Sequence, residues 1–171
     1  METNQQGMII TRNQDFLLRF ATPDDAALIV EYARRLGEFQ HMLHAVTASE
    51  EDAAHLIAAK KGEVVFGYYQ GKIVGFMYFT EKSSIFLGQN GLFIDMLFID
   101  EEMRGKGFGK IFISFLAQLA VERQCQRLEW CCMDWNTPAI DFYNKLGAYR
   151  VEEMHTFRFT PDNVKKVASM F

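Results

Sequence analysis

The sequence predicts a fold of the α/β class, in which helices cover both faces of a mixed sheet. Two observations lead to this prediction. Apolar segments with the patterning of strands alternate with segments whose apolar residues recur at helical spacing. In addition, a two-strand hairpin precedes a central apolar strand, after which helices and strands follow in turn. We expect one domain, because a chain of 171 residues can bury a substantial core.

The N-terminal part contains the first predicted strand and helix. Residues 1–14 are polar and are expected to be loosely ordered, so that the single domain covers residues 15–171. Residues 16–20 predict a strand. Thr22 is the expected N-cap of a helix, because Pro23 follows at the first helical position and an acid stands three residues after the cap.

A second helix and a hairpin follow the connecting residues 38–46. Ser49, with Asp52 three residues later, predicts the start of this helix, and Gly62 is expected to end it. The dipeptide Gln70-Gly71 lies between two apolar segments, which is typical of a hairpin turn. The hairpin strands, a loop and the central strand are expected, in that order, at residues 64–69, 72–79, 81–90 and 92–99.

The second half of the chain begins with a helix at residues 110–122, whose apolar side chains recur at i, i+3, i+4 and i+7. A strand at residues 127–133 follows. Asn136 or Thr137 caps another helix, which Gly147 ends. The remaining expectations are two closing strands, at residues 149–153 and 156–160, and a helical tail that packs on something, such as a second subunit.

A Gly-rich basic loop, Arg104-Gly105-Lys106-Gly107-Phe108-Gly109, joins the central strand to the next helix. Backbone N–H groups at the positive end of a helix form a site for phosphate, and glycine lets the backbone approach closely. Arg104, Lys106 and Lys110 add positive charge. The loop therefore predicts a ligand that carries a pyrophosphate.

The spacing of the loop excludes two nucleotide motifs. A P-loop requires Ser or Thr after Gly-Lys, but Ile111 follows Lys110. A dinucleotide fingerprint requires a third Gly where Lys110 stands. The pattern [RQ]-x-x-G-x-[GA] does fit, with Arg104, Gly107 and Gly109 at its specified positions. This pattern resembles the acyl-CoA loop of the GNAT N-acetyltransferases.

A second segment supports the same resemblance. Residues 135–148 are similar to the GNAT signature N-x-x-A-x-x-[FL]-Y-x-x-x-G-[FA], with Asn136, Ala139, Tyr143 and Gly147 in place. Within the superfamily the chain is most similar to the diamine branch, of the spermidine/spermine type. The resemblance implies a mostly antiparallel central sheet of about six to seven strands that is splayed in the middle. The pantetheine arm of acetyl-CoA would lie in the gap and bond to backbone groups of Leu97, Phe98 and Ile99.

Composition limits the partners. The net charge of -4 argues against a general nucleic-acid binder and is consistent with a cationic substrate. Three cysteines without framework spacing indicate reduced thiols and a cytoplasmic location. No apolar run is long enough for a membrane span. His41, His44 and His55 lack the neighbours of a metal site, so we expect no metal.

Two residues are candidates for the chemistry. The resemblance implies that Tyr143 protonates the leaving thiolate, although a tyrosine packed on the apolar face of its helix would look the same. Asp95 is the only acid inside the central apolar run, and a carboxylate there costs free energy unless it is paired or functional. The polyamine-acetylating relatives carry Glu at this position, where it contacts the amine. The shorter Asp95, followed by Met96 in place of a second acid, leaves open a water relay, a structural hydrogen bond or a solvated position.

Further candidates come from the resemblance and from charge. Acetyl-CoA would contact the loop from Arg104 to Lys110 together with Asn136, Ala139, Tyr143 and Lys145, although a helix cap and a solvated lysine are the simpler interpretations of Asn136 and Lys145. Glu38, Phe39 and Glu81 could line the amine site.

We therefore expect an acetyl-CoA-dependent transferase that acetylates a primary amine of a small molecule, by direct transfer, and that forms a homodimer like many relatives. The alternatives are a non-catalytic acyl-CoA-binding module and a protein or peptide acetyltransferase that acts on lysine or on the N-terminus.

Overall fold

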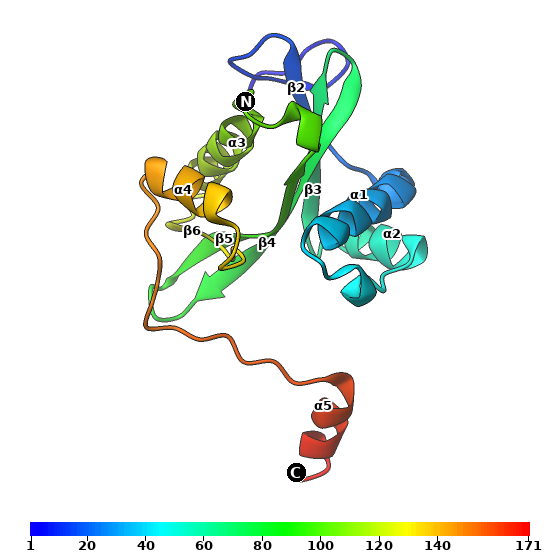
Figure 1. Cartoon of the computed structure of the whole chain (residues 1–171), viewed down its shortest axis with the longest axis vertical. Helices are drawn as coiled ribbons and strands as arrows, with labels where there is room; N and C mark the ends of the chain where they lie inside the picture. The colour runs from blue at the N-terminus through cyan, green and yellow to red at the C-terminus, as the bar shows by residue number, and fades with distance from the viewer. The chain divides into compact units, whose positions relative to one another are not determined.

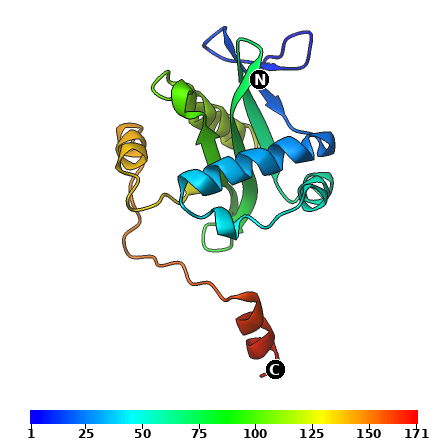
Figure 2. The same ribbon diagram turned by 45° about the vertical axis from the view of Figure 1, so that its right-hand side comes forward.

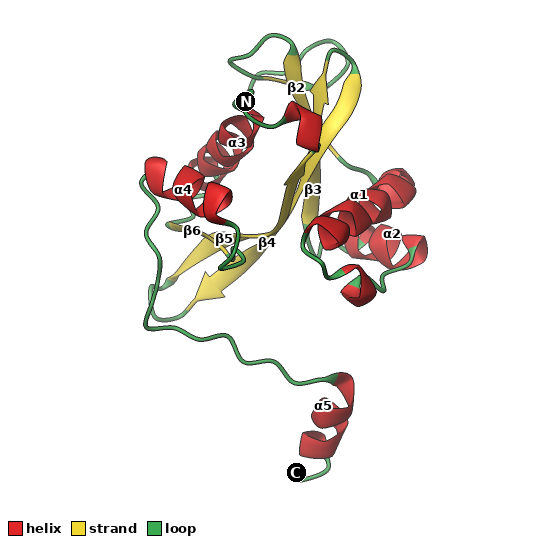
Figure 3. Cartoon of the chain, viewed as in Figure 1, coloured by secondary structure: helices red, strands yellow, loops and turns green.

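The computed structural model describes residues 1–171. They form two compact units, Met1–Cys131 and Cys132–Phe171. The first unit contains the whole sheet, drawn in yellow in Figure 3. Its helices α1 (Ala26–Phe39) and α2 (Glu50–Ala58) cover one face, and α3 (Phe108–Glu122) covers the other (Figures 1 and 2). The predicted α/β architecture, with helices on both faces, is therefore confirmed.

The six strands lie in the sheet in their sequence order. Every neighbouring pair is antiparallel except β5–β6, which is parallel. The sheet is thus mixed and mostly antiparallel, as predicted. The strands are β1 (Ile9–Ile10), β2 (Phe16–Phe20), β3 (Glu63–Tyr69), β4 (Lys72–Ser84), β5 (Gln89–Ile99) and β6 (Arg127–Trp130).

The sheet opens beside the second half of β5. The partnership with β6 covers only residues 91–94 of β5, so residues 95–99 have no strand on that side. On its other side β5 pairs with β4 throughout, with one irregularity: Tyr78 lies opposite Met96, whereas Phe79 lies opposite Ile94. Asp95 is consequently the extra residue of a β-bulge, a feature that redirects side chains and is common beside active sites.

Local sequence signals explain where the helices begin. Thr22 and Asp25 form a capping box ahead of the 3-10 turn η1 (Pro23–Asp25), and α1 follows directly. Ser49 and Asp52 form a second capping box at the start of α2, in which the Ser49 hydroxyl accepts a hydrogen bond from the Asp52 N–H at 3.1 Å. Each box satisfies N–H groups that a helix start leaves without partners. Both predicted helix starts are confirmed.

Aromatic side chains fill the core on both faces of the sheet. Tyr32 of α1 packs with Phe66, Phe76 and Phe98 on one face. On the other face the ring of Phe16 stacks on Phe108, with ring centroids 4.2 Å apart, and meets the edge of Phe112. Gly67 makes room for this second cluster, because a Cβ there would lie 2.5 Å from Phe16 and 2.8 Å from Phe112. Burial of each such side chain contributes roughly 1.5–3 kcal/mol.

Several predicted boundaries were wrong. Residues 81–90 form the ends of β4 and β5, joined by a short turn, instead of a loop. The strand that starts at Arg127 ends at Trp130, not at Met133. Helix α2 ends at Ala58, ahead of the predicted Gly62, and the left-handed residue that follows it is Lys60, with φ 52°.

The predictions near the two termini were partly correct. Residues 149–153 and 156–160 form no strand, since an apolar pattern alone supplies no neighbouring backbone to pair with. Residues 1–14, for which we expected little order, contain β1 and a bridge between Thr3 and Ile9. In the second unit, α4 (Thr137–Lys145) and α5 (Pro161–Ala168) occupy the two positions where helices were predicted.

Candidate active site

The Gly-rich loop lies between η3 (Glu101–Met103) and α3. Gly105 and Gly107 have φ values of 77° and 85°, and a Cβ at either position would meet nothing within 4 Å. The backbone there faces open space. The Ile111 N–H donates to the Gly107 carbonyl at 3.2 Å, so the N–H groups that precede it at the helix start have no helical acceptor. This arrangement fits a phosphate group, as the sequence predicts.

Arg104 is held by its own segment and by α1. Its Nε donates to the Ile99 carbonyl at 3.1 Å, and its Nη1 lies 3.6 Å from the Glu101 carboxylate. The guanidinium carbon lies 4.4 Å from the ring centroid of Phe39 and 5.5 Å from that of Phe98. A residue predicted to bind the cofactor and a residue predicted to line the amine site are therefore in contact.

The other cofactor candidates of the loop divide into two groups. The side chains of Lys106 and Lys110 are exposed, so their charge is available to an anion. The side chain of Phe108 is buried against Phe16, which leaves only its backbone for a ligand. Gly109 lies in the first turn of α3.

Backbone groups of Leu97, Phe98 and Ile99 line the open side of β5. These residues pair with Met77, Phe76 and Gly75 of β4, and their other side has no strand. In a strand, successive N–H and C=O groups point alternately to the two sides. Some of these groups therefore point into the opening, where the resemblance implies the pantetheine arm.

Asp95 is exposed at the bulge. Burial raises the pKa of Tyr78, and the negative charge of Asp95 raises it further, so the phenol and the carboxylate are neighbours. Tyr78 lies against Gly62, where a Cβ would come within 2.3 Å of the ring. Tyr78 could not be selected from the sequence, because a tyrosine in an apolar strand gives no functional signal.

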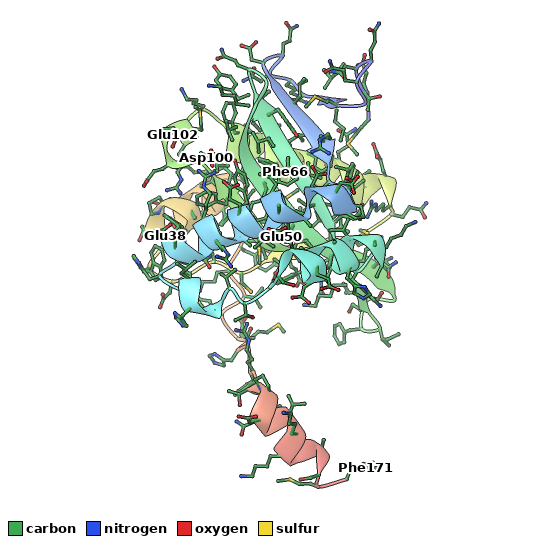
Figure 4. The ribbon with its side chains drawn as sticks, turned by 90° about the vertical axis from the view of Figure 1, so that its right-hand side faces the viewer. Glu38, Glu50, Phe66, Asp100, Glu102 and Phe171 are labelled. Atoms are coloured by element: carbon green, nitrogen blue, oxygen red, sulfur yellow. The ribbon has the colours of Figure 1, made fainter.

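The three amine-site candidates fall in different places. Phe39 contacts Arg104 beside the loop. Glu38 is exposed at the carboxyl end of α1, where Figure 4 labels it together with Asp100 and Glu102. Glu81 lies in β4, and its carboxylate is 3.5 Å from Nη1 of Arg123. Arg123 follows the last residue of α3, so Glu81 lies away from the Gly-rich loop, which is at the other end of this helix. Arg123 also forms a two-bond pair with Glu63.

The second unit carries the remaining candidates on α4. The Asn136 side chain accepts a hydrogen bond from the Ala139 N–H at 3.4 Å and so caps the helix. Tyr143 packs beside Phe142, and burial, with a smaller contribution from Cys132, raises the pKa of its phenol to about 12. The phenol is therefore protonated at neutral pH. Lys145 is exposed in the last turn of α4.

The family of this chain is shown by its similarity to known proteins. Residues 38–148 match the model of the acetyltransferase (GNAT) family, and this match covers well over half of the chain. The chain belongs to the acetyltransferase (GNAT) family. The matched residues include Phe39, Asp95, Arg104 and Tyr143, which lie in different elements of the fold.

Relatives of this acetyltransferase carry out amine chemistry. The chain is 29% identical over 168 residues to thialysine N-epsilon-acetyltransferase of Bos taurus, a match that covers 89% of this chain and 96% of the relative. It is 36% identical over 95 residues to L-ornithine N5-acetyltransferase of Arabidopsis thaliana, which covers 56% of this chain and 42% of that protein. It is also 39% identical over 85 residues to spermine/spermidine N(1)-acetyltransferase of Bacillus subtilis, covering 47% of this chain and 55% of the relative.

Solved structures support the fold of this acetyltransferase. An integron cassette protein of V. cholerae superposes with a TM-score of 0.74 at 24% identity, covering 90% of this chain and 98% of that one. An aminoglycoside acetyltransferase from an uncultured soil metagenomic sample, solved with sisomicin, gives a TM-score of 0.75 at 17% identity, with 88% and 99% covered.

Three further observations concern the co-substrate, metal ions and membranes. Acetyl-CoA is the co-substrate of the family, and the open loop at Gly105 and Gly107 fits its pyrophosphate. No three side chains of His, Cys, Asp or Glu are grouped so that they could hold a metal ion. No helix has the length and apolar character needed to cross a bilayer.

Proposed function

We propose that this acetyltransferase moves the acetyl group of acetyl-CoA to a primary amine of a small molecule, such as a diamine, a polyamine or a basic amino acid. The observation that carries the proposal is the position of Asp95. It is an exposed carboxylate in a β-bulge, at the point where β6 leaves β5. The names of the relatives point to the same class, since ornithine, thialysine and spermidine all carry a primary amine.

The acceptor must lose a proton before it attacks. An alkylammonium has a pKa of about 10.4, so deprotonation at neutral pH costs about 4–5 kcal/mol. Asp95 attracts the ammonium group and takes its proton, either directly or through one water molecule. The side chain of Asp is short, but the bulge directs it out of the regular pleat, where the amine can approach.

Acetyl-CoA supplies an activated acetyl group as a thioester. Backbone N–H groups on the open side of β5, among Leu97, Phe98 and Ile99, stabilise the negative charge that develops on the carbonyl oxygen. The Tyr143 phenol, whose pKa is about 12, gives its proton to the departing thiolate. Arg104, Lys106 and Lys110, together with the loop backbone, hold the phosphates.

The remaining parts of the proposal concern binding and assembly. Asn136, Ala139 and Lys145 contact CoA from α4, and Glu38 and Phe39 line the amine site.

We place the enzyme in the cytoplasm, because its three cysteines are free thiols. We also propose a homodimer, in which the apolar face of α5 packs on a second copy. Light scattering of the purified chain should therefore give twice the mass of one chain.

The test is turnover with labelled acetyl-CoA and a panel of acceptors. The panel contains ornithine, lysine, thialysine, putrescine, spermidine and a lysine peptide, and mass spectrometry reads the products. We expect acetylation of one or more of the small amines. Transfer only to the peptide would favour a protein acetyltransferase instead. Binding of CoA without any transfer would favour a non-catalytic module.

A further inference from the structure

Asp100 is a buried charge outside the reaction described above. It is the only charged residue of the chain that is buried, with 7% of its surface exposed. It stands directly between the end of β5 and η3. Its N–H donates to the Val74 carbonyl at 2.9 Å, and its carbonyl accepts from the Met103 N–H at 2.9 Å. The backbone at Asp100 is thus fixed on both sides, just ahead of the Gly-rich loop.

The partners of the Asp100 carboxylate both come from α1. Arg35 Nη2 lies 2.9 Å from Oδ1, and the Tyr32 hydroxyl donates to Oδ2 at 3.5 Å. The Arg35 guanidinium also lies over the rings of Tyr32 and Phe98, at 4.7 and 5.6 Å from their centroids. Burial raises the pKa of Asp100, and the positive charge of Arg35 opposes this rise.

Stability alone is a poor explanation for such a pair. A buried ion pair loses much hydration free energy, and well-packed apolar residues in its place are often as stable or more stable. What an ion pair does provide is a fixed geometry between the two elements that carry it. Here those elements are the carboxyl-terminal half of α1 and the residue that starts the loop segment.

A second contact joins the same two elements at the other end of the segment. Arg104, just before the first loop glycine, lies over Phe39, the last residue of α1. Phe98 lies under both guanidinium groups, one from α1 and one from the loop. Residues 100–104 are therefore attached to α1 at both ends.

We propose that Arg35 and Asp100 are positioning residues that hold the loop in the conformation that binds the CoA phosphates. The inference rests on the proposed function, because it assumes that this loop binds CoA. Through Phe39 and Arg104, the same arrangement links the loop to the end of α1, where the proposed amine site begins. Loss of the ion pair should therefore weaken the binding of CoA although neither residue touches it.

The test compares two ion pairs in the same protein. In the Arg35→Met/Asp100→Asn variant both charges are removed together, so that neither is left buried alone. The matched control is Arg123→Met/Glu63→Gln. It removes an ion pair with hydrogen bonds of 2.5 and 2.8 Å, just beyond the carboxyl end of α3 and away from the Gly-rich loop at its amino end. Calorimetry measures the Kd of CoA, urea unfolding measures stability, and steady-state kinetics separates kcat from KM.

We expect the first variant to raise the Kd of CoA by about tenfold or more, the effect of loosening a positioned group. The control should leave the Kd within twofold, whatever it does to stability. Equal Kd values for the first variant and the unaltered chain, or equal increases in both variants, would overturn the proposal. If the first variant does not fold, Phe39→Leu removes the second contact, and an unchanged Kd there would also overturn it.

The outcome is separable from that of the proposed function. If the unaltered chain binds no CoA, the proposed function fails together with this inference. If it binds CoA and acetylates an amine, but the Arg35→Met/Asp100→Asn variant binds CoA equally well, only the positioning role is lost.

Discussion

The guanidinium of Arg104 lies over the ring of Phe39, 4.4 Å from its centroid. Arg104 opens the loop that we propose binds the CoA phosphates, and Phe39 ends the helix that leads to the proposed amine site. A planar cation over an aromatic ring is attracted by the negative face of that ring. The contact is a direct physical connection between the two proposed binding regions, one for each substrate.

Arg104→Lys tests whether shape or charge matters at this position. Lysine keeps the positive charge but loses the planar group and the Nε bond to Ile99. We expect the KM for acetyl-CoA to rise by about tenfold, since the loop is then anchored by charge alone. Lys106→Arg, at an exposed position of the same loop, is the control and should change little. Equal kinetics for Arg104→Lys and the unaltered enzyme would show that charge suffices.

Tyr143→Phe removes the proposed acid and keeps the ring. We expect kcat to fall by about 100-fold, the lower end of what a positioned general acid contributes. The Kd of CoA should stay within twofold, because the ring still packs beside Phe142. Tyr149→Phe, at an exposed tyrosine of the same unit, serves as the control. An unchanged kcat in Tyr143→Phe would leave the tyrosine a packing role only.

Asp95→Asn tests the acceptor side separately from the donor side. The amide keeps the size of the side chain but has no charge to attract an ammonium group or take its proton. We expect kcat/KM for the amine to fall by at least about tenfold, with the KM for acetyl-CoA nearly unchanged. Initial rates with each substrate varied in turn, at a fixed concentration of the other, give both values. Glu31→Gln, at an exposed acid of α1 outside the proposed site, is the matched control for the loss of one negative charge.

Some residues of the candidate site could be predicted from the sequence, and others could not. The backbone geometry of the loop from Arg104 to Gly109 could be predicted, because its glycines and the helix start that follows them are both local signals. The contact of Glu81 with Arg123 could not be predicted, because the two residues are 42 positions apart in the chain. Asp100 and Arg35 gave no signal for the same reason. Charged residues look solvated in a sequence until the fold brings their partners together.

In the fold, too, features set by neighbouring residues could be predicted, and features set by distant residues could not. The capping boxes at Thr22 and Ser49 and the turn at Gln70 and Gly71 lie within a few residues and were predicted at the right places. The β-bulge at Asp95 depends on the register of β4 against β5. No pattern within one strand reveals such a register, so the position that carries the proposed function could be selected from the sequence but not explained.

Gly62→Ala tests the close packing of Gly62 against Tyr78, the neighbour of Asp95. A Cβ at position 62 would lie 2.3 Å from Cε2 and 2.5 Å from the hydroxyl oxygen of Tyr78. The strain of overpacking should lower the free energy of unfolding by about 1–3 kcal/mol, measured in urea. Combining the change with Tyr78→Ala removes the clash, so the two effects should not add. Simple additivity would show that Gly62 is required for another reason.

Asp25→Asn predicts a stability effect that depends on pH. Arg19, which donates two hydrogen bonds to the carboxylate, lowers the pKa of Asp25, and the Thr22 N–H lowers it further. Because the folded pKa lies below the unfolded value of about 3.9, the stabilisation is present above that value and is lost as the pH falls through the folded pKa. At pH 7 we expect Asp25→Asn to reduce the free energy of unfolding by about 1–2 kcal/mol, in the range of lost helix caps. In urea titrations at pH 7, 5 and 3 the difference from the unaltered chain should shrink at the lowest pH. Asp24→Asn, at the neighbouring exposed acid, should show no comparable difference, and an Asp25→Asn deficit that is equally large at pH 3 would contradict the assignment.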